Sequence, residues 1–297
     1  MDVERSLPAS KRTHDGLSTL VDTHNHLAGW SPDASQTYEE ILEATARRGI
    51  AGVAISDHYD PDCVTSSGDP WIFDPDAYME TFYPRRRRPS TRAPGDPVGF
   101  LVAVEVGWMP ETSRTLHRLL AGYPFDFSIV SLHYLHHHDP YSHAEQVYTG
   151  PLEAVYTEVI EAIADSAEDM SEAHIVGHYD FFSRYAPIER SKMCYHHAPE
   201  AFDRLFRVMV KNDQVLEINT GTVDALTRKK HYTLEDAMPD RAILMRYREL
   251  GGRYVSIASD AHAPRQNGRF VRETLAYLTQ LGFDQTVWYE AGERFVG

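Results

Sequence analysis

Potential metal ligands occur in closely spaced pairs near both ends of the chain. His24 and His26 are separated by one residue, and so are Asp260 and His262. Residues two positions apart in extended backbone point to the same side, so each pair can present two side chains to one site. Histidine is the commonest metal ligand in proteins, and the chain contains 16 histidines. These pairs predict metal-dependent chemistry.

Four further candidate ligands stand in comparable positions, each shortly after a short apolar run. They are His58, Glu105, His133 and His178. Short apolar runs bounded by Gly, Asp and Pro are typical of buried parallel strands. The predicted strands are centred on residues 20–21, 53–55, 100–104, 127–130, 174–176, 215–218 and 254–257, with a weaker eighth at 286–288.

Amphipathic segments between these runs predict helices at 38–44, 152–167, 201–210, 241–250 and 269–281. Strands and helices that alternate along the chain are typical of a parallel α/β fold with right-handed crossovers. Seven such strands without a dividing linker favour a single barrel. The carboxyl ends of barrel strands form one face, where active sites lie. A lone histidine at a strand end is more often a core or capping residue, but eight candidates on one face favour a metal cluster.

The chemistry of the candidate ligands limits the metal. Imidazole and carboxylate without thiolate suit Zn, Fe or Mn better than Ca or Mg. The candidates exceed what one four- to six-coordinate ion can take, so two or three divalent ions are expected, with a carboxylate bridging two of them. Closely spaced ions lower the pKa of bound water and serve hydrolysis at phosphorus or acyl carbon.

Two segments depart from the strand–helix rhythm. Residues 1–18 are polar and predict a flexible N-terminal tail before one domain over 19–297. Residues 61–99 hold seven prolines and the run Arg85-Arg86-Arg87-Arg88, which indicates an insertion between the second and third strands. This run could be a phosphate clamp or a nucleic-acid patch, but a solvated loop or helix face is the interpretation we favour.

Composition excludes several classes of protein. The chain has 297 residues with 29 Lys and Arg against 44 Asp and Glu, a formal net charge of −15. Such a surface repels nucleic acid and anionic lipid at long range. No apolar run is long enough for a membrane span, and the N-terminus does not resemble a signal peptide. Two cysteines cannot form a disulfide framework, so we expect a cytoplasmic protein with reduced thiols. Nothing in the sequence indicates an oligomeric state.

Taken together, the motifs resemble those of the polymerase and histidinol phosphatase (PHP) family. The likeness extends over roughly residues 19–290, and it implies a distorted (β/α)7 barrel with three metal ions at the carboxyl ends of the strands. The motifs that carry it are His24-Asn25-His26, Ser56-Asp57-His58, Glu105, Ser131-Leu132-His133, Gly177-His178-Tyr179-Asp180 and Ser259-Asp260-Ala261-His262.

The resemblance also implies how the ligands divide among the ions. The first ion takes His24, His26, Glu105 and Asp260. The second shares Glu105 and takes His133 and His178. The third takes Asp33, His58 and His262. Asp33 enters through Ser31-Pro32-Asp33-Ala34, which is similar to the family's Ser-Pro-Asp-Gly with Ala in place of Gly.

Within the family, the chain most resembles stand-alone histidinol-phosphate phosphatases, through the segments 125–133, 139–141 and 216–221. This subgroup implies that Arg184 and Arg228 hold the substrate, and a guanidinium does offer paired donors to phosphate oxygens. The expected activity is hydrolysis of a small phosphate monoester, L-histidinol phosphate above all. The alternatives are a phosphoesterase for another ester, a nuclease for single-stranded nucleic acid, and a non-catalytic metal-binding protein. The net charge argues against a nucleic-acid partner.

Overall fold

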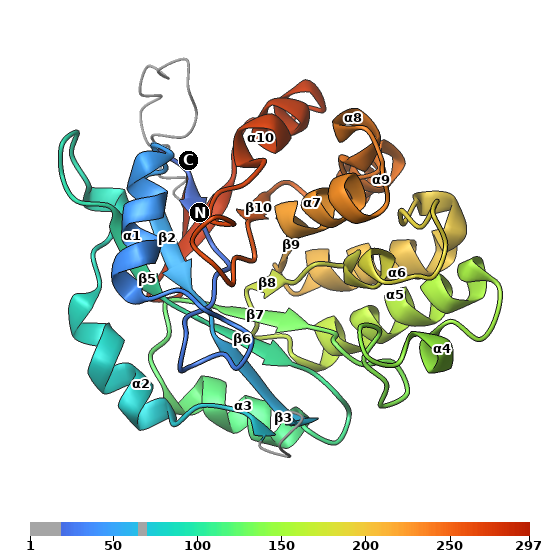
Figure 1. The fold of residues 1–297 in the computed structure, drawn as a ribbon, viewed down its shortest axis with the longest axis horizontal. Coiled ribbons are helices and arrows are strands. Elements are labelled where there is room, and N and C mark those ends of the chain that lie inside the picture. Colours follow the sequence, from blue (N-terminus) through green and yellow to red (C-terminus); the bar gives the residue numbers. More distant parts are fainter. Residues whose placement is uncertain (1–18, 65–69) are drawn as a thin grey trace, which may run out of the picture.

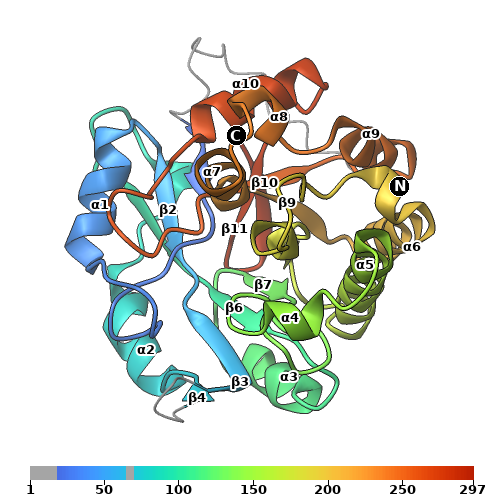
Figure 2. The same ribbon diagram turned by 45° about the vertical axis from the view of Figure 1, so that its right-hand side comes forward.

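The protein is described from a computed structural model that covers residues 19–64 and 70–297. The predicted tail at 1–18 therefore lies outside the described residues. Parallel strands occupy the centre, and the helices lie around them (Figures 1 and 2). This arrangement is the α/β architecture that the alternating pattern predicts.

The parallel strands fall into two hydrogen-bonded groups. The first has the order β1-β2-β5, from β1 (Val21–Asp22), β2 (Gly52–Ile55) and β5 (Gly99–Val102). The second runs β10-β9-β8-β7-β6-β3-β4, in which β4 pairs antiparallel with β3 and the other neighbours are parallel. Its strands are β3 (His58–Val64), β4 (Pro70–Trp71), β6 (Val104–Gly107), β7 (Ser128–Ser131), β8 (Ile175–Val176), β9 (Val215–Asn219) and β10 (Val255–Ala258).

Two connections join these groups. Only Ala103 separates β5 from β6, so one continuous piece of chain takes part in both. At the other side, the Thr23 amide donates to the Ile257 carbonyl at 3.3 Å, and Asn25 forms an isolated parallel bridge with Ala261. The first and last of the parallel strands therefore lie next to each other, although Thr23 and Ile257 are 234 residues apart in the chain.

Every residue of β2, β5, β6, β7, β9 and β10 is buried, as expected for strands that are covered on both faces. The covering helices of eight or more residues are α1 (Tyr38–Arg47), α2 (Pro75–Phe82), α3 (Ser113–Gly122), α5 (Leu152–Asp169), α6 (Pro199–Lys211), α7 (Thr220–Lys229), α9 (Arg241–Glu249) and α10 (Val271–Gln280). Two single turns, α4 (Ala144–Val147) and α8 (Leu234–Ala237), complete the set. None of the described helices is long and apolar enough to cross a membrane.

The predicted strand at 286–288 forms, but in a different pairing. It becomes β11 (Val287–Glu290), which pairs antiparallel with β12 (Glu293–Val296) instead of adding an eighth parallel strand. Thr286 pairs with Gly297 and adds an isolated parallel bridge to Val255 of β10. The C-terminal hairpin therefore packs beside the parallel strands and does not extend their order.

The expectation of a solvated arginine run is wrong for Arg86. Its side chain is only 13% exposed and donates from Nε to Oδ2 of the fully buried Asp126 at 2.8 Å, with a second, short contact from Nη2 to Oδ1. Arg87 forms an antiparallel bridge with Phe100 of β5. Two positions of the run therefore fasten the 61–99 segment to the strands.

Candidate metal centre

The carboxyl ends of the parallel strands bring the predicted ligands into one cluster. Different combinations of three ligands place one atom each within 4.8 Å of one another. These combinations are His24 with His26 and Asp260, His24 with Glu105 and His178, His58 with Glu105 and His133, and His26 with His58 and His262.

Glu105 of β6 lies at the centre of this cluster and is fully buried. Its Oε2 is 3.1 Å from His24 Nε2 and 2.9 Å from His58 Nδ1. Its Oε1 is 3.1 Å from His133 Nε2 and 2.8 Å from His178 Nε2. Burial opposes the charge on this carboxylate, but the surrounding imidazoles hold its pKa well below the usual range. Glu105 thus stands where a carboxylate shared by two ions would stand.

Asp33, which only the family resemblance suggested, also reaches the cluster. Its Oδ2 is 3.1 Å from His262 Nε2, and its Oδ1 is 3.8 Å from His58 Nε2. The side chain is 42% exposed. Partial loss of water opposes its charge, but the neighbouring imidazoles lower the pKa of this carboxyl. All nine predicted ligands therefore converge, and their roles as ligands stay a prediction.

The cluster contains buried polar atoms that its own side chains do not satisfy. His24 Nε2, His26 Nε2, His58 Nδ1 and Glu105 Oε2 have no aligned hydrogen-bond partner among the described residues, although several lie within ion-pair distance of one another. Leaving buried polar atoms unpaired costs about 1–3 kcal/mol each. Imidazole nitrogens and carboxylate oxygens converging in this way suit divalent cations such as Zn, Fe or Mn. The residues present therefore fit metal ions.

Two further carboxylates contact two of the imidazoles on the ring nitrogen that faces away from the centre. Glu217 Oε2 is 2.8 Å from His24 Nδ1, and Asp60 Oδ2 is 2.9 Å from His133 Nδ1. Such an acceptor keeps the proton on Nδ1, so that Nε2 is free to face the centre. Sequence reasoning did not assign these two carboxylates. The available signal was the spacing of Asp60, two residues after His58 on the same strand.

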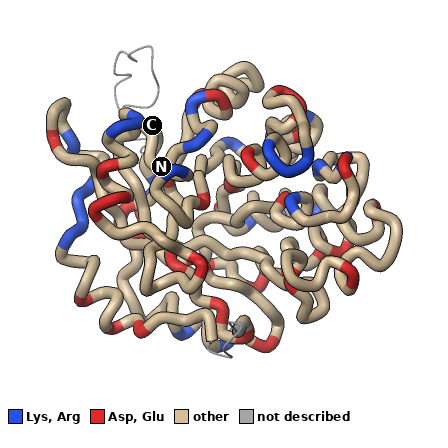
Figure 3. The backbone as a smooth tube through the Cα atoms, viewed as in Figure 1, with Lys and Arg blue, Asp and Glu red and all other residues tan. Residues whose placement is uncertain are grey.

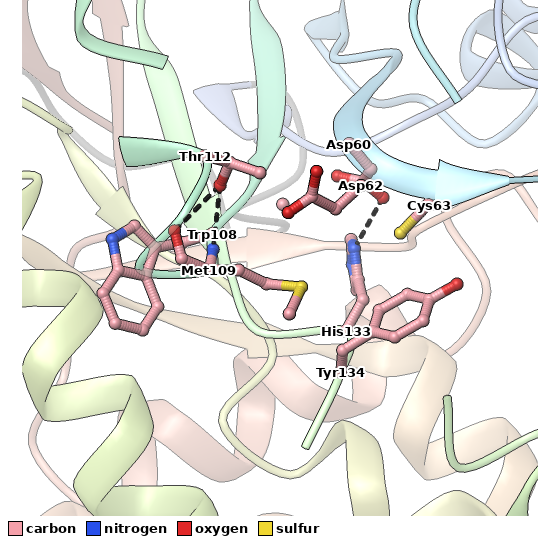
Figure 4. A pocket seen from close by; sticks show the side chains of 9 residues that line it. Asp60, Asp62, Cys63, Trp108, Met109, Thr112, His133 and Tyr134 are labelled. Carbon is pink, nitrogen blue, oxygen red and sulfur yellow. Dashed lines mark hydrogen bonds and ion pairs between the residues drawn. The ribbon is translucent and has the colours of Figure 1, made fainter. Parts of the chain in front are cut away.

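Figure 4 shows Asp60 pointing toward His133 in a small cavity beside the cluster. The cavity has a volume of about 10 Å³, barely enough for one water molecule. Gly107 lines it, and a Cβ atom at this position would collide with the Asp60 carboxylate. The glycine that ends β6 therefore makes room for the carboxylate that orients His133.

The backbone of Asp260 is also unusual, because its φ of 51° lies in the left-handed region. A non-glycine residue held there costs free energy, and such residues gather at functional sites. The Asp260 amide donates to the His24 carbonyl at 2.8 Å, which fixes this conformation beside the first pair of histidines.

Arg184, in the short 3-10 helix Phe181–Arg184, lies against the same cluster. Its Nη1 donates to Asp260 Oδ2, its Nη2 to Asn219 Oδ1 and its Nε to Thr222 Oγ1, each at 2.9 Å. The side chain is 9% exposed, so a buried positive charge stands beside a predicted ligand. This is a suitable position for a group that holds an anionic substrate.

The structure does not bring Arg228 to the cluster. This residue lies near the end of α7, its side chain is 64% exposed, and its nearest carboxylate is Asp224 at 3.7 Å. It lines a separate pocket that contains none of the nine predicted ligands. A contact between Arg228 and substrate stays a prediction for which the described geometry offers no support.

The fold and the cluster define a class of protein: an α/β fold that carries a candidate centre for several metal ions at the ends of its strands. Residues 22–221 match the PHP domain. The chain therefore belongs to the PHP domain family, which confirms the resemblance inferred from the motifs.

Curated relatives and a solved structure are similar over most of the chain. A probable histidinol-phosphatase of Clostridium acetobutylicum is 27% identical over 244 residues, 82% of this chain and 86% of that protein. A histidinol-phosphatase of Lactococcus lactis is 20% identical over 190 residues, 64% of this chain and 68% of that protein. The crystal structure of histidinol phosphate phosphatase from L. lactis, complexed with Zn, L-histidinol and phosphate, superposes with a TM-score of 0.79 at 18% identity, covering 93% of this chain and 99% of that one. The last comparison establishes a shared fold.

Proposed function

We propose that this protein is a metal-dependent phosphomonoesterase that hydrolyses L-histidinol phosphate to L-histidinol and phosphate. The convergence of nine predicted ligands around the buried Glu105 carries the proposal, because such a set suits hydrolysis at phosphorus. The names of the relatives support the choice of substrate. The reaction class rests on the geometry, and the identity of the leaving alcohol rests on the likeness.

The proposal includes the division of ligands that the family resemblance implies. His24, His26, Glu105 and Asp260 would hold one ion, and Glu105 would share the next with His133 and His178. Asp33, His58 and His262 would hold the third. Bound Zn, Fe or Mn supplies Lewis acidity toward phosphate oxygens and lowers the pKa of a coordinated water.

The chain's own residues would bind and orient the ester. Arg184 would place its guanidinium against the phosphate, since its position beside Asp260 puts a buried positive charge at the edge of the centre. Glu217 and Asp60 would keep the His24 and His133 rings in fixed orientations. Preorganised charge of this kind stabilises the negative charge that spreads over the phosphate oxygens in the transition state.

We also propose that residues 19–297 form one domain whose parallel strands close into a distorted (β/α)7 barrel. The hydrogen bond from Thr23 to Ile257 and the bridge between Asn25 and Ala261 support closure between β1 and β10. Closure would place every predicted ligand at one mouth of the barrel, which agrees with where barrel enzymes keep their active sites.

The test is phosphate release from a panel of monoesters that includes histidinol phosphate, with Zn, Mn and Fe supplied separately. We expect histidinol phosphate to be hydrolysed with a kcat/KM at least tenfold above that of other esters. A single-stranded DNA degradation assay on the same preparation tests the nuclease alternative. Degradation of DNA without hydrolysis of any monoester would contradict the proposed phosphomonoesterase activity.

Glu105→Gln tests the centre itself, because it keeps the size of the side chain and removes its charge. We expect loss of at least one metal equivalent and of nearly all turnover. The matched control is Glu111→Gln, an exposed glutamate shortly after the same strand, which should behave like the parent. Full metal content with normal turnover in Glu105→Gln would contradict the shared-carboxylate role.

A further inference from the structure

A second pocket lies apart from the predicted ligands. It has a volume of about 270 Å³, and its charged lining residues are Arg48, Arg228, Arg265, Arg269, Asp224 and Glu273. We call it the arginine pocket. Figure 2 shows the elements that carry these residues: the segment before α10 passes between α1 and α7, and α10 follows it. Four guanidinium groups face two carboxylates, an excess of positive charge on a chain whose net charge is −15.

Arg269 is the most buried of the four arginines, with a side chain that is 13% exposed. Its Nη1 donates to Asp224 Oδ2 at 3.0 Å, and its Nη2 donates to the Ser259 carbonyl at 3.2 Å. Its Nε is buried without a hydrogen-bond partner among the described residues. Burial lowers the pKa of this guanidinium despite Asp224, so the nearby carboxylate compensates its charge incompletely.

The remaining arginines are also poorly compensated. Arg228 lies 3.7 Å from the same Asp224 that already pairs with Arg269. Within the described ranges, Arg48 and Arg265 form no ion pair with a carboxylate, and the Arg48 Nη2 makes only a 3.5 Å contact with the Arg265 carbonyl. Like charges gathered around a hollow repel one another, and an anion in the hollow removes this cost.

The start of α10 adds to the positive character of the pocket. Phe270 precedes the helix with a φ of 52° and makes no capping hydrogen bond through its side chain. The first amides of a helix have no partner within the helix, and the helix dipole favours an anion at this end. Phe270 and Glu273 both line the pocket, so the first turn of α10 borders it.

We propose that the arginine pocket binds a phosphate dianion, either free or as the head of a small organic phosphate. Guanidinium groups match phosphate oxygens with paired donors, and a helix N-terminus is a common phosphate site. A volume of about 270 Å³ lies just below the range of pockets for drug-sized ligands, which suits a small metabolite. The site is additional to the metal centre and to its proposed reaction.

The pocket is in contact with the backbone of the metal centre. Arg269 holds the carbonyl of Ser259, the residue before Asp260. Gln266, another residue of the pocket wall, accepts from the His262 amide through Oε1 at 2.8 Å. An anion that binds Arg269 would therefore change the hydrogen bonds of the segment that carries the predicted ligands Asp260 and His262. In this way, binding in the pocket can affect the metal centre.

The experiment counts phosphate-binding sites on the metal-loaded protein by equilibrium dialysis with labelled inorganic phosphate. The variant is Arg48→Ser with Arg265→Ser, two exposed arginines of the pocket rim. The matched control is Arg47→Ser, an exposed arginine of α1 that pairs with Glu43. We expect the double variant to bind one equivalent fewer than the parent, or to bind it at least tenfold more weakly, while the control binds like the parent.

Equal numbers of sites and equal affinities in parent and double variant would overturn the proposal. This criterion does not depend on the proposed function, since a failed phosphatase assay leaves the difference between parent and variant intact. If the double variant unfolds, Arg265→Gln alone provides the same comparison. A parallel titration with phenylphosphonate separates the two sources: tighter binding than inorganic phosphate identifies an organic phosphate, and weaker binding identifies the free ion.

Discussion

A histidine binds a cation through only one ring nitrogen. The hydrogen-bond partner of the other nitrogen therefore influences how strongly and in which orientation the histidine binds the cation. In the cluster, Glu217 occupies Nδ1 of His24 and Asp60 occupies Nδ1 of His133. Both carboxylates are buried. Glu217 also accepts from the His178 amide and from Asn219 Nδ2 through its other oxygen, which fixes its own position. A negative partner makes the imidazole a stronger donor and fixes its plane.

Asp60→Asn is expected to weaken metal binding without emptying the site completely. The amide oxygen can still accept from His133, but the negative charge that favours the required proton position is lost. Losing such a partner costs roughly 10–100-fold in metal affinity. Competition of the metal-free protein with a chromogenic chelator for zinc measures this change.

The control for this variant is Asp62→Asn, an exposed aspartate of the same strand that lines the same cavity but, among the described residues, forms no hydrogen bond or ion pair with the cluster histidines. Turnover of Asp60→Asn should recover in part when zinc is supplied in excess. An unchanged zinc affinity in Asp60→Asn would mean that His133 is oriented by other contacts.

At the scale of elements, Asp126 joins parts of the chain that are distant in sequence. It accepts from the Val102 amide of β5 at 2.9 Å and from the Ala291 amide of the C-terminal hairpin at 2.9 Å. Arg86, from the 61–99 segment, donates a hydrogen bond to the same carboxylate. One buried charge therefore fastens the insertion, a parallel strand and the hairpin together.

Arg86→Ser is expected to lower the free energy of unfolding by about 3 kcal/mol, because it leaves a buried carboxylate without its counter-charge. Arg88→Ser, at an exposed position of the same run, should stay within about 0.5 kcal/mol of the parent. Urea denaturation followed by circular dichroism compares the two variants. Equal midpoints for both would show that the backbone amides alone hold Asp126 in place.

Elements with a strong local pattern could be predicted from the sequence, and elements whose pattern is weak or whose contacts lie across the fold could not. The apolar runs before His58, His133 and His178 predicted both strands and ligands, because ligand and strand end coincide. The apolar run at 286–288 gave no sign of its antiparallel partner, because β12 is partly exposed and lacks an apolar run.

The same distinction applies to single residues. Asp60 and Glu217 became visible as supports only through contacts across the fold. Arg228 follows the Asn219 motif in the sequence, but α7 begins directly after Asn219 and carries the chain away. At 1.5 Å of rise per residue, Arg228 lies roughly 12 Å along the helix from its first residue. A motif located by sequence distance therefore gives a poor estimate of position once a helix intervenes.

At the scale of the whole molecule, 44 acidic residues outnumber 29 basic ones, and both kinds are spread over the fold (Figure 3). The three carboxylates of the predicted ligand set, Asp33, Glu105 and Asp260, belong to this excess. Divalent ions held by them would bring the net charge of the folded protein closer to zero than the formal −15. Metal loading should therefore affect stability as well as catalysis.

Removing metal with EDTA is expected to destabilise the folded protein. A cation that binds only the folded state adds about 2.7 kcal/mol for each site when its free concentration is a hundred times its Kd. For a chain of this size, 1 kcal/mol corresponds to about 2–4 °C in Tm, so loss of one ion should lower Tm by about 5–10 °C. Calorimetry before and after EDTA, with restoration by added zinc, measures the change.

Glu105→Gln should respond less to EDTA than the parent, since it has already lost one equivalent, while Glu111→Gln should respond fully. A parent Tm that stays constant after complete metal removal would mean that the cluster is held by the fold alone and that its unpaired atoms cost less than their burial indicates.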